Sequence, residues 1–242
     1  MHPEVPLKTA LDIGAGPGTA LFALSEVFPE LETISLFEKE RAFIELGKKL
    51  SDDPRAVWQE GKIDQNVHLE PHDLVILAYS LGEFASLCNE ELIAKLWQAT
   101  KEFLIIIEPG TPLGFSHILQ MRTRLLSLGA QIIAPCPHQG RCPESWCHFA
   151  ARCERSSAHR FLKGGSLNYE DEKFSYIIAS KNSQTVNTAR ILRHVEKSKG
   201  EILLTLCTEE GIEKKRITRK NKQLYQIARK AEWGDTFSEQ LD

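Results

Sequence analysis

A glycine-rich turn between an apolar segment and a helical segment is the feature that most limits how this chain can fold. The turn runs Asp12-Ile-Gly-Ala-Gly-Pro-Gly-Thr19 and directly follows the apolar stretch Lys8–Ile13. Glycines let the backbone approach a ligand closely, and the helix that opens at Thr19 offers unpaired N–H groups to polar ligand atoms. The turn therefore predicts a ligand-binding loop at the end of a buried strand.

The spacing of the glycines distinguishes between two kinds of ligand loop. The dinucleotide fingerprint needs a glycine at position 19, where this chain has Thr19. The form Asp-x-Gly-x-Gly-x-Gly resembles instead motif I of class I S-adenosylmethionine (SAM) methyltransferases. In that family an acid at the end of the second strand, here Glu38, holds the ribose hydroxyls, and Asp64 is a candidate for the adenine edge. The SAM-binding residues that the resemblance implies are Asp12, Gly14, Ala15, Gly16, Gly18, Thr19, Glu38 and Asp64. A tight turn without a ligand, and Glu38 as a solvated surface acid, stay open as alternatives.

Short β-rich runs alternate with helical stretches over residues 7–133. Alternation of this kind predicts a mostly parallel sheet with helices on both faces, which is the doubly wound α/β architecture. We expect strands at Lys8–Ile13, Thr33–Glu38, Ala56–Gln59, Asp73–Tyr79 and Phe103–Glu108, and helices at Thr19–Phe28, Glu40–Leu50, Asn89–Lys101 and Ser116–Leu128.

The chain divides into three zones by composition. Residues 1–133 form the expected methyltransferase-like core, and residues 134–173 contain four of the six cysteines among Pro, His, Gly and Arg. Residues 174–242 return to strand-like runs and then a basic helical tail, so we expect one or more final core strands and a small β-rich basic region. The expected elements of this last zone are Tyr176–Ser180, Arg190–Val195, Glu201–Cys207, Ile212–Ile217 and the helix Gln223–Glu232.

Composition excludes several classes of protein. Hydrophobic residues make up 42% of the chain, as in ordinary globular proteins, and the longest apolar runs are too short to span a bilayer. A net charge of −3 means that any surface for nucleic acid is local. No signal peptide is visible, and six cysteines in such a chain indicate thiol or metal chemistry before disulfides. We expect a soluble cytoplasmic protein of bacterial type, monomeric and without membrane contacts.

The cysteine-rich segment has the spacing Cys136-x5-Cys142-x4-Cys147-x5-Cys153, without the paired C-x2-C hooks of common zinc ribbons. Proline follows both Cys136 and Cys142, which keeps the loop open around a ligand. On spacing alone Cys153 is the fourth ligand, with Arg141 and Arg152 as possible donors to the thiolates. Free structural cysteines are the alternative, and the histidines of this segment, His138, His148 and His159, are either ligands or solvated loop residues.

The cysteine segment and three other motifs together resemble one family. The motifs are the run Cys136–Phe149, the stretch Tyr169–Tyr176, the loop Glu108–Pro112 and the ending Arg229–Asp235. They are similar to those of the methyltransferase-like family of small-ribosomal-subunit proteins, whose mitochondrial members attach to the assembling small subunit. The resemblance covers nearly the whole chain.

The resemblance implies a SAM-type domain with a four-iron four-sulfur cluster. The implied ligands are Cys136, Cys142, Cys147 and, from a later strand, Cys207. This assignment leaves Cys153 outside the site, and zinc is the alternative metal. Family members usually carry a helical region before the first strand, whereas this sequence begins almost at that strand. If that region covers the SAM pocket or contacts RNA, we expect isolated activity to depend on it.

A basic segment near the C-terminus is the third chemical signal. Between Lys214 and Lys230 there is no acid, and Tyr225 is interleaved among the cations. Such local charge is the electrostatic footprint of phosphate-backbone binding, although a solvated surface face is the alternative. The predicted RNA-binding residues are Lys214, Lys215, Arg216, Arg219, Lys220, Lys222, Arg229 and Lys230.

No catalytic residue can be named. The segment Asp73–Glu83 stands where amine methyltransferases carry an Asn/Asp-Pro-Pro-aromatic motif, and that motif is absent. Glu83 and Glu108 are candidate bases, with structural hydrogen bonding as the alternative, and Cys88 is expected to be structural. The sequence therefore predicts an assembly factor that binds the small subunit and its rRNA, with SAM-dependent rRNA methylation left open. A zinc-stabilised SAM-dependent methyltransferase with a non-ribosomal substrate is the alternative.

Overall fold

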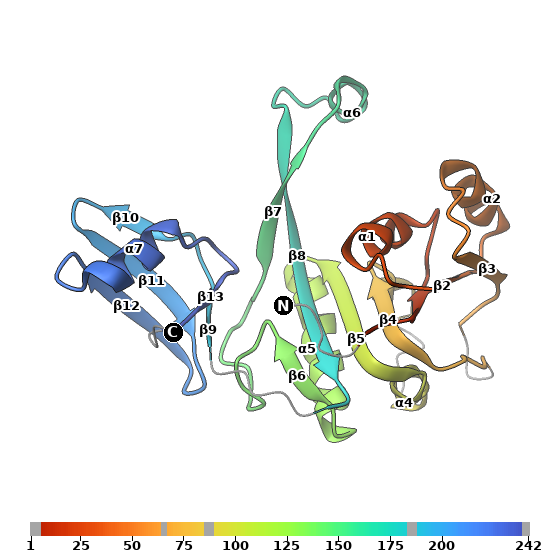
Figure 1. Ribbon diagram of the computed structural model, residues 1–242, viewed down its shortest axis with the longest axis horizontal. Coiled ribbons are helices and arrows are strands. Elements are labelled where there is room, and N and C mark those ends of the chain that lie inside the picture. The colour runs from red at the N-terminus through yellow and green to blue at the C-terminus, as the bar shows by residue number, and fades with distance from the viewer. Residues whose placement is uncertain (1–5, 64–66, 85–89, 183–187, 239–242) are drawn as a thin grey trace. The chain divides into compact units, whose positions relative to one another are not determined.

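The computed structural model describes residues 6–63, 67–84, 90–182 and 188–238, which form two compact units (Figure 1). The first unit comprises Met1–Glu108, His117–Ala134 and Ile177–Gln184, and the second comprises Pro109–Ser116, Pro135–Tyr176 and Thr185–Asp242.

The first unit is built on a mixed sheet with the strand order β3-β2-β1-β4-β5-β8-β6. Strands β3, β2, β1, β4 and β5 pair in parallel, and β8 pairs antiparallel with β6. The inner strands are buried on both faces, which explains why they are continuous apolar runs in the sequence. The strands are β1 (Thr9–Ile13), β2 (Thr33–Glu38), β3 (Ala56–Glu60), β4 (His72–Ala78), β5 (Thr100–Pro109), β6 (Gln131–Ala134) and β8 (Tyr169–Ser180).

Helices connect these strands, and their positions confirm the expected alternation. They are α1 (Thr19–Val27), α2 (Arg41–Leu50), α3 (Leu81–Phe84), α4 (Glu90–Gln98) and α5 (Pro112–Ser127). Helix α5 begins about one turn before the start predicted at Ser116. The Thr111 hydroxyl accepts a hydrogen bond from the Gly114 amide at 3.0 Å, and Pro112 occupies the first helical position, where a missing N–H costs nothing. Gly129 ends the helix in the left-handed region (φ 82°).

The strand order reverses between β1 and β4. Strand β1 pairs with β2 on one side and with β4 on the other, so the connections from these two strands leave toward opposite edges of the sheet. In open α/β sheets such a switch point leaves a crevice at the carboxyl ends of the strands, and ligands bind there. The glycine turn follows β1 at this point.

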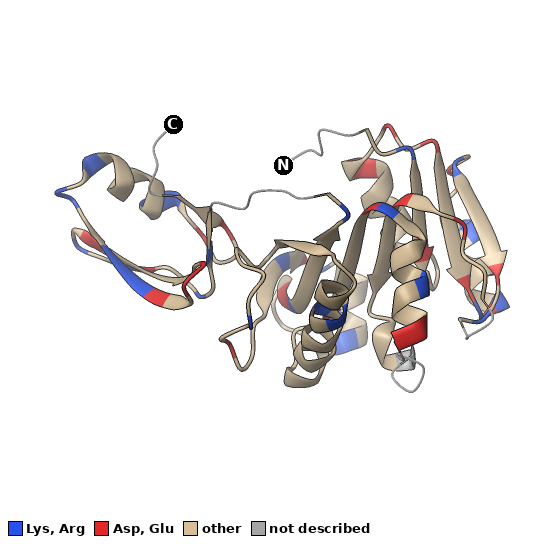
Figure 2. Cartoon of the chain, turned by 90° about the horizontal axis from the view of Figure 1, so that it is seen from below, with Lys and Arg blue, Asp and Glu red and all other residues tan. Residues whose placement is uncertain are grey.

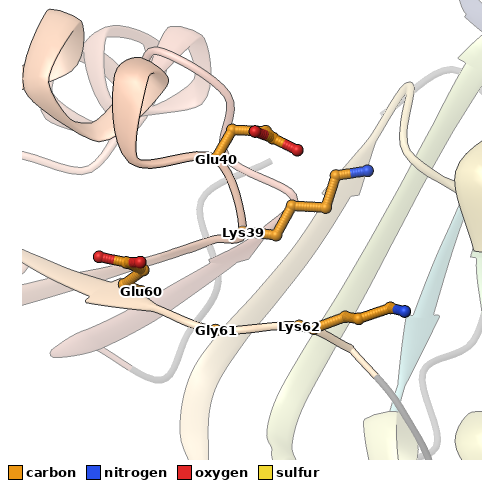
Figure 3. Close-up of a pocket in the computed structure, with 5 residues that line it drawn as sticks. All are labelled: Lys39, Glu40, Glu60, Gly61 and Lys62. Atoms are coloured by element: carbon orange, nitrogen blue, oxygen red, sulfur yellow. The ribbon is translucent and has the colours of Figure 1, made fainter.

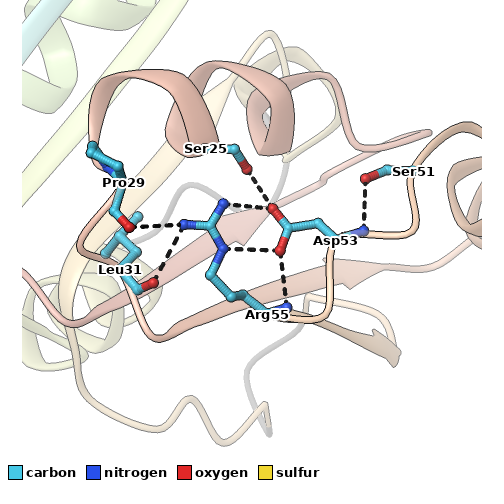
Figure 4. A network of polar contacts seen from close by, with 6 residues as sticks. All are labelled: Ser25, Pro29, Leu31, Ser51, Asp53 and Arg55. Atoms are coloured by element: carbon cyan, nitrogen blue, oxygen red, sulfur yellow. Dashed lines mark hydrogen bonds and ion pairs between the residues drawn. The ribbon is translucent and has the colours of Figure 1, made fainter.

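A polar network fixes the connections around α1 and α2 (Figure 4). The Arg55 guanidinium donates to both oxygens of Asp53, at 2.9 and 2.6 Å, and to the carbonyls of Pro29 and Leu31. The Ser25 hydroxyl donates to the same carboxylate at 2.7 Å. Hydrogen bonding from Arg55 holds the pKa of Asp53 well below its ordinary value, although burial opposes this. The network therefore joins the end of α1 to the segment that precedes β3.

The second unit contains a two-stranded arm and a small sheet. In the arm, β7 (Phe149–Glu154) pairs antiparallel with the first half of β8. The connection between the two strands contains α6 (Ser157–Lys163). No local sequence pattern predicts β7, because its side chains are mostly exposed and its extended form depends on pairing with β8. Helix α6 is capped at its start by Ser156 and at its end by Gly164, and none of its residues is buried.

The small sheet has β11 (Glu201–Cys207) at its centre. Strands β9 (Ala189–Ile191) and β10 (Glu196–Ser198) pair with one edge of β11, and β12 (Ile212–Thr218) pairs with it over its whole length. Helix α7 (Lys222–Lys230) packs Leu224 and Ala228 against the apolar face of this sheet, and β13 (Thr236–Phe237) pairs with β9. The expected strand Arg190–Val195 is shorter than predicted and ends at Ile191.

Within the described ranges, no helix combines the length and the apolar character that crossing a bilayer requires.

Candidate functional site

The glycine loop of the first unit has the conformation that its sequence predicts. Gly14, Gly16 and Gly18 all have positive φ, at 71°, 54° and 85°, which side chains with a Cβ rarely adopt. The amides of Gly14 and Ala15 both donate to the Phe37 carbonyl, at 2.9 and 3.1 Å, so the loop is tied to the end of β2. Thr19 is the first residue of α1, whose N-terminus therefore faces the loop.

Glu38 ends β2 and is buried, so the alternative of a solvated surface acid is wrong. One carboxylate oxygen accepts from the Gly16 amide and the other from the Glu40 amide, each at 2.8 Å. The carboxylate thus holds the glycine loop from the neighbouring strand. Its remaining lone pairs are the ones that could accept hydrogen bonds from ribose hydroxyls.

Asp12 supplies a second buried carboxyl beside the same loop. Burial raises the pKa of Asp12 to about 7, and the charge of Glu38 adds to the rise. Its Oδ2 atom is buried and has no hydrogen-bond partner among the described residues. A buried acceptor without a partner costs about 1–3 kcal/mol, so this atom fits a ligand that brings a donor or a positive charge. The ammonium group of SAM is such a donor.

An open hollow of about 580 Å³ lies at the carboxyl ends of β2 and β3. Lys39 and Glu40 line it from β2, and Glu60, Gly61 and Lys62 line it from β3. Figure 3 shows the side chains of Lys39 and Lys62 extending to the same side, whereas Glu60 points to the other. The predicted adenine-edge residue Asp64 follows this hollow in sequence and lies outside the described residues.

The ends of β4 and β5 hold the candidate catalytic groups. Glu108 is buried, and its carboxylate accepts from the Leu81 amide at 3.1 Å and lies 3.3 Å from Nδ1 of His117. Its two oxygens are therefore engaged in structural contacts. Tyr79, just after β4, is the non-glycine residue with positive φ (57°) in the described chain. Cys88 lies outside the described residues, and the Glu83 side chain is not described.

The second unit brings together four cysteines that are far apart in sequence. Cys136, Cys142 and Cys147 lie in the loop between β6 and β7, and Cys207 ends β11 and is buried. Burial raises the pKa of the Cys147 thiol far above its ordinary value. The thiols of Cys136, Cys142 and Cys207 raise it further through their charge, so each of these three thiols lies within electrostatic reach of Cys147.

Cys153 does not join this group. It lies on β7, is exposed, and its sulfur contacts the Ala151 carbonyl at 3.9 Å. His138 and His148 are buried, contrary to the expectation of solvated loop residues, whereas His159 lies in the first turn of α6. His148 is stacked on Trp146 at 4.2 Å and meets the edge of Trp233 at 5.1 Å, and burial lowers its pKa.

The four cysteine thiols suit some kinds of metal centre better than others. Among the residues that the structure describes, no three His, Cys, Asp or Glu side chains are arranged to hold a metal ion. A cluster of several irons does not need three side chains around one ion, because each thiolate binds its own iron. Four cysteines held largely out of water fit such a cluster chemically. A bound metal would also displace the proton that burial otherwise keeps on the Cys147 thiol.

The basic segment occupies β12 and α7, where Figure 2 shows several Lys and Arg positions in blue. Arg216 pairs with Glu201, and Lys215 is half-buried. The remaining cations are exposed and form no ion pair with any residue in the described ranges. These are Lys214, Arg219, Lys220, Lys222, Arg229 and Lys230.

Sequence reasoning missed one charged residue near the cysteines. Arg190 lies on β9 directly opposite Cys207 on β11. The two arginines predicted as donors lie elsewhere: Arg152 is exposed and bonded to Asp171 at 2.7 and 2.9 Å, and Arg141 is exposed. No local signal could have identified Arg190, because its place depends on strand pairing.

The strand order, the switch point and the glycine loop define an α/β protein of the Rossmann-like SAM-methyltransferase class. The chain belongs to the mitochondrial small ribosomal subunit Rsm22 family, whose sequence model matches residues 2–238.

Two relatives are similar to this chain over almost all of its length. The human mitochondrial ribosome assembly protein METTL17 is 26% identical over 97% of this chain and 56% of its own length. The mitochondrial Rsm22-cox11 tandem protein 2 of Schizosaccharomyces pombe is 27% identical over 94% of this chain and 38% of its own length. The chain thus spans about half of METTL17 and less of the tandem protein.

Among solved structures, precorrin-6y C5,15-methyltransferase from Geobacter metallireducens has a TM-score of 0.49 at 14% identity, covering 74% of this chain and 83% of that one. An S-adenosylmethionine-dependent methyltransferase from Mesorhizobium loti has a TM-score of 0.47 at 12% identity, covering 74% and 94%.

Proposed function

We propose that this protein is a methyltransferase-like assembly factor of the small ribosomal subunit that binds rRNA through its basic segment. The observation that carries the proposal is the family match over residues 2–238, together with METTL17, a relative named as a ribosome assembly protein. The proposal extends to a four-iron four-sulfur cluster on Cys136, Cys142, Cys147 and Cys207, and to SAM at the glycine loop.

The arrangement of the basic segment supports RNA binding. Strand β12 leads through a short turn into α7, so the two elements lie next to each other in the chain and pack on the same central strand. Exposed cations occur on both elements and in the turn between them, and Arg219 lies 5.8 Å from the ring of Tyr225. A cation without an acidic partner binds phosphate at a lower free-energy cost, because no existing ion pair must be broken.

Neutralising two of these cations tests the RNA-binding surface. In the variant Lys220→Gln/Lys222→Gln, we expect weaker binding to purified rRNA of the small subunit and a shallower dependence of affinity on salt. Each lost phosphate contact reduces the slope of log affinity against log salt by about 1, so the pair should reduce it by about 2. Filter binding over a salt series measures this slope.

The matched control is Lys48→Gln/Lys49→Gln, which removes two exposed cations from the end of α2 in the first unit. Equal slopes in the two double variants would show that the basic segment has no special role. A slope change confined to the basic segment would support the proposal.

The cysteine group supports a metal centre by its chemistry. Four buried or half-buried thiols from two distant segments have no disulfide among them. Ligation would join the loop before β7 to the last residue of β11, which gives the centre a structural role within the second unit. Zinc is the alternative metal, and the ratio of iron, acid-labile sulfide and zinc in anaerobically purified protein distinguishes the two.

A second candidate function is SAM-dependent methylation of rRNA. It is favoured by the unpaired Oδ2 atom of Asp12 beside the glycine loop. When bound, SAM would supply an electrophilic methyl group. In this chain Asp12 would face the ammonium group, Glu38 would orient the ribose, and the amides at the start of α1 would meet polar atoms of the ligand. No residue is assigned as the base for methyl transfer.

Replacing Gly16 with arginine tests whether SAM binds at this loop. Gly16 has a φ of 54°, and its amide donates to Glu38, so a side chain there strains the backbone and fills the space before the loop. The arginine side chain would occupy space that SAM needs, and a backbone that relaxes this strain would move the loop amides, so we expect SAM affinity to fall by about tenfold or more in calorimetry. Labelled methyl transfer from SAM to immature subunits, if wild-type protein performs it, should be lost as well.

The control for this variant is Gly129→Arg, because Gly129 also has positive φ and open space around it but lies after α5. The two variants carry the same added side chain and a similar backbone penalty. If both bind SAM as the wild-type protein does, the glycine loop is not the SAM site.

A further inference from the structure

We propose that Arg190 is the residue that balances the negative charge of the metal centre and helps to hold it. This inference rests on the proposed function, because it concerns the centre formed by the four cysteines. It assigns Arg190 as a positioning residue, with the Tyr176 hydroxyl as its neighbour at the same place.

Strand pairing puts Arg190 beside Cys207. The two residues face each other in the antiparallel pair of β9 and β11. Side chains of directly opposed residues in such a pair lie on the same face of the sheet, with Cβ atoms about 5 Å apart. Arg190 therefore projects from the same face as the cysteine that ends β11.

The guanidinium of Arg190 also reaches the loop that carries the other cysteines. Its Nε atom donates to the Pro135 carbonyl at 3.1 Å, and Pro135 directly precedes Cys136. Its Nη1 atom donates to the Gly234 carbonyl at 2.8 Å. These bonds hold the planar group between β9, the start of the cysteine loop and the segment after α7.

The positive charge of Arg190 has no acidic partner in the described part of the chain, and no hydrogen bond of its Nη2 atom is found there. The residue is half-buried, and a buried charge without a counter-charge is costly. The neighbouring arginine differs in this respect, since Arg193 bonds to Glu144 at 3.0 Å. Arg190 is therefore a cation beside the cysteines that meets no acidic side chain among the described residues.

A metal centre on four cysteines would supply a counter-charge. Four thiolates carry four negative charges, and either a zinc ion or an oxidised four-iron four-sulfur core carries two positive charges. The complex therefore has a net charge of −2 with either metal. A fixed guanidinium beside it offsets part of this charge and offers N–H donors to the sulfur atoms, and such groups tune retention and potential in metal sites.

Tyr176, on β8, lies near Arg190 and the cysteines. Its ring packs against Phe149 and Phe174, with centroids 5.3 and 5.7 Å away, in the apolar group that includes Cys207 and Cys147. Burial raises the pKa of the Tyr176 hydroxyl, Arg190 opposes the rise, and the charges of Cys147 and Cys136 add to it. The hydroxyl thus lies within electrostatic reach of both Arg190 and the cysteines.

The experiment compares Arg190→Lys and Arg190→Gln in the full chain, purified anaerobically and loaded with iron and sulfide. Lysine keeps the charge but not the planar fork, and glutamine loses both. We expect Arg190→Gln to lose at least twofold more metal than wild type after gel filtration, or to keep it with a more negative midpoint potential, because reduction adds negative charge. We expect Arg190→Lys to stay close to wild type in both readouts.

The control is Arg152→Gln, which removes an exposed arginine bonded to Asp171 on the arm and should leave metal content and potential unchanged. If Arg190→Gln folds poorly, Tyr176→Phe keeps the ring packing and removes only the hydroxyl, and a shifted potential in that variant supports the inference. If the wild-type protein binds zinc instead, the rate of zinc loss to a chelator replaces the potential.

Two results would overturn the inference. Wild-type metal content and potential in Arg190→Gln and Tyr176→Phe would show that neither side chain acts on the centre. Equal metal loss in Arg190→Lys and Arg190→Gln would show that the bonds to Pro135 and Gly234 matter and the charge does not. A wild-type chain that binds neither iron nor zinc would instead reject the metal centre itself, and that outcome is distinguishable from both.

Discussion

Replacing Cys207 with serine is expected to remove the metal from the protein, whereas replacing Cys153 with serine leaves the metal in place. Cys207 ends β11 within electrostatic reach of Cys147, and Cys153 lies exposed on β7. Iron content should fall from about four per chain to less than one in Cys207→Ser, because three thiolates leave one iron of such a cluster without its protein ligand. Chemical assays of iron and acid-labile sulfide after anaerobic purification measure both variants.

The same substitution is expected to destabilise the second unit strongly. Metal binding at the four cysteines would join the cysteine loop to the central strand of the small sheet, and the free energy of binding would then contribute to folding. Thermal unfolding followed by circular dichroism should show a lower midpoint for Cys207→Ser than for Cys153→Ser. Full metal in Cys207→Ser, together with loss in Cys153→Ser, would return Cys153 to the ligand set that spacing alone suggests.

The substitution Asp12→Asn is expected to stabilise the protein, and by more as the pH rises. Folded Asp12 has a pKa of about 7 instead of 3.8, so the folded chain holds this proton more tightly than the unfolded chain. The free energy of unfolding therefore falls as the pH rises from about 4 to about 7 and is level above that range. Asparagine does not titrate, so the advantage of Asp12→Asn should reach about 4 kcal/mol at pH 8.

Urea unfolding at pH 5 and pH 8 measures this effect, and the difference between variant and wild type should grow by about 3 kcal/mol between the two values. Asp53→Asn is the control. Hydrogen bonding from Arg55 lowers the pKa of Asp53, so its contribution is fully present above pH 4 and is lost only at lower pH. Asp53→Asn should therefore be destabilised equally at pH 5 and pH 8. A constant difference for Asp12→Asn would mean that Asp12 ionises as freely as in water.

The sequence was sufficient to predict the core of the first unit because that core obeys local rules. Strand β2 was predicted to the residue, since Thr33–Glu38 is an apolar run ending in an acid and is buried on both faces. The glycine loop was equally visible, because positive φ at three positions restricts the residue type. Helix α5 begins earlier than predicted, because Thr111 and Pro112 favour a helix start more strongly than Ser116 does.

Features that depend on pairing between distant segments could not be predicted from the residues alone. The cysteine spacing favoured Cys153, and only the strand pairs of the small sheet bring Cys207 toward the loop. The place of Arg190 has the same origin. The conformation of β7 also depends on its partner, because a strand of mostly exposed side chains has no hydrophobic alternation to identify it.

The carboxylate of Glu38 holds the glycine loop in place through the amides of Gly16 and Glu40. The loop therefore acquires its shape when the chain folds, and a ligand does not have to order it on arrival. The conformational entropy of these residues is already lost before binding, so more of the contact energy appears as affinity. For the same reason, ligand association at this loop should be limited by diffusion and desolvation, with no slow ordering step.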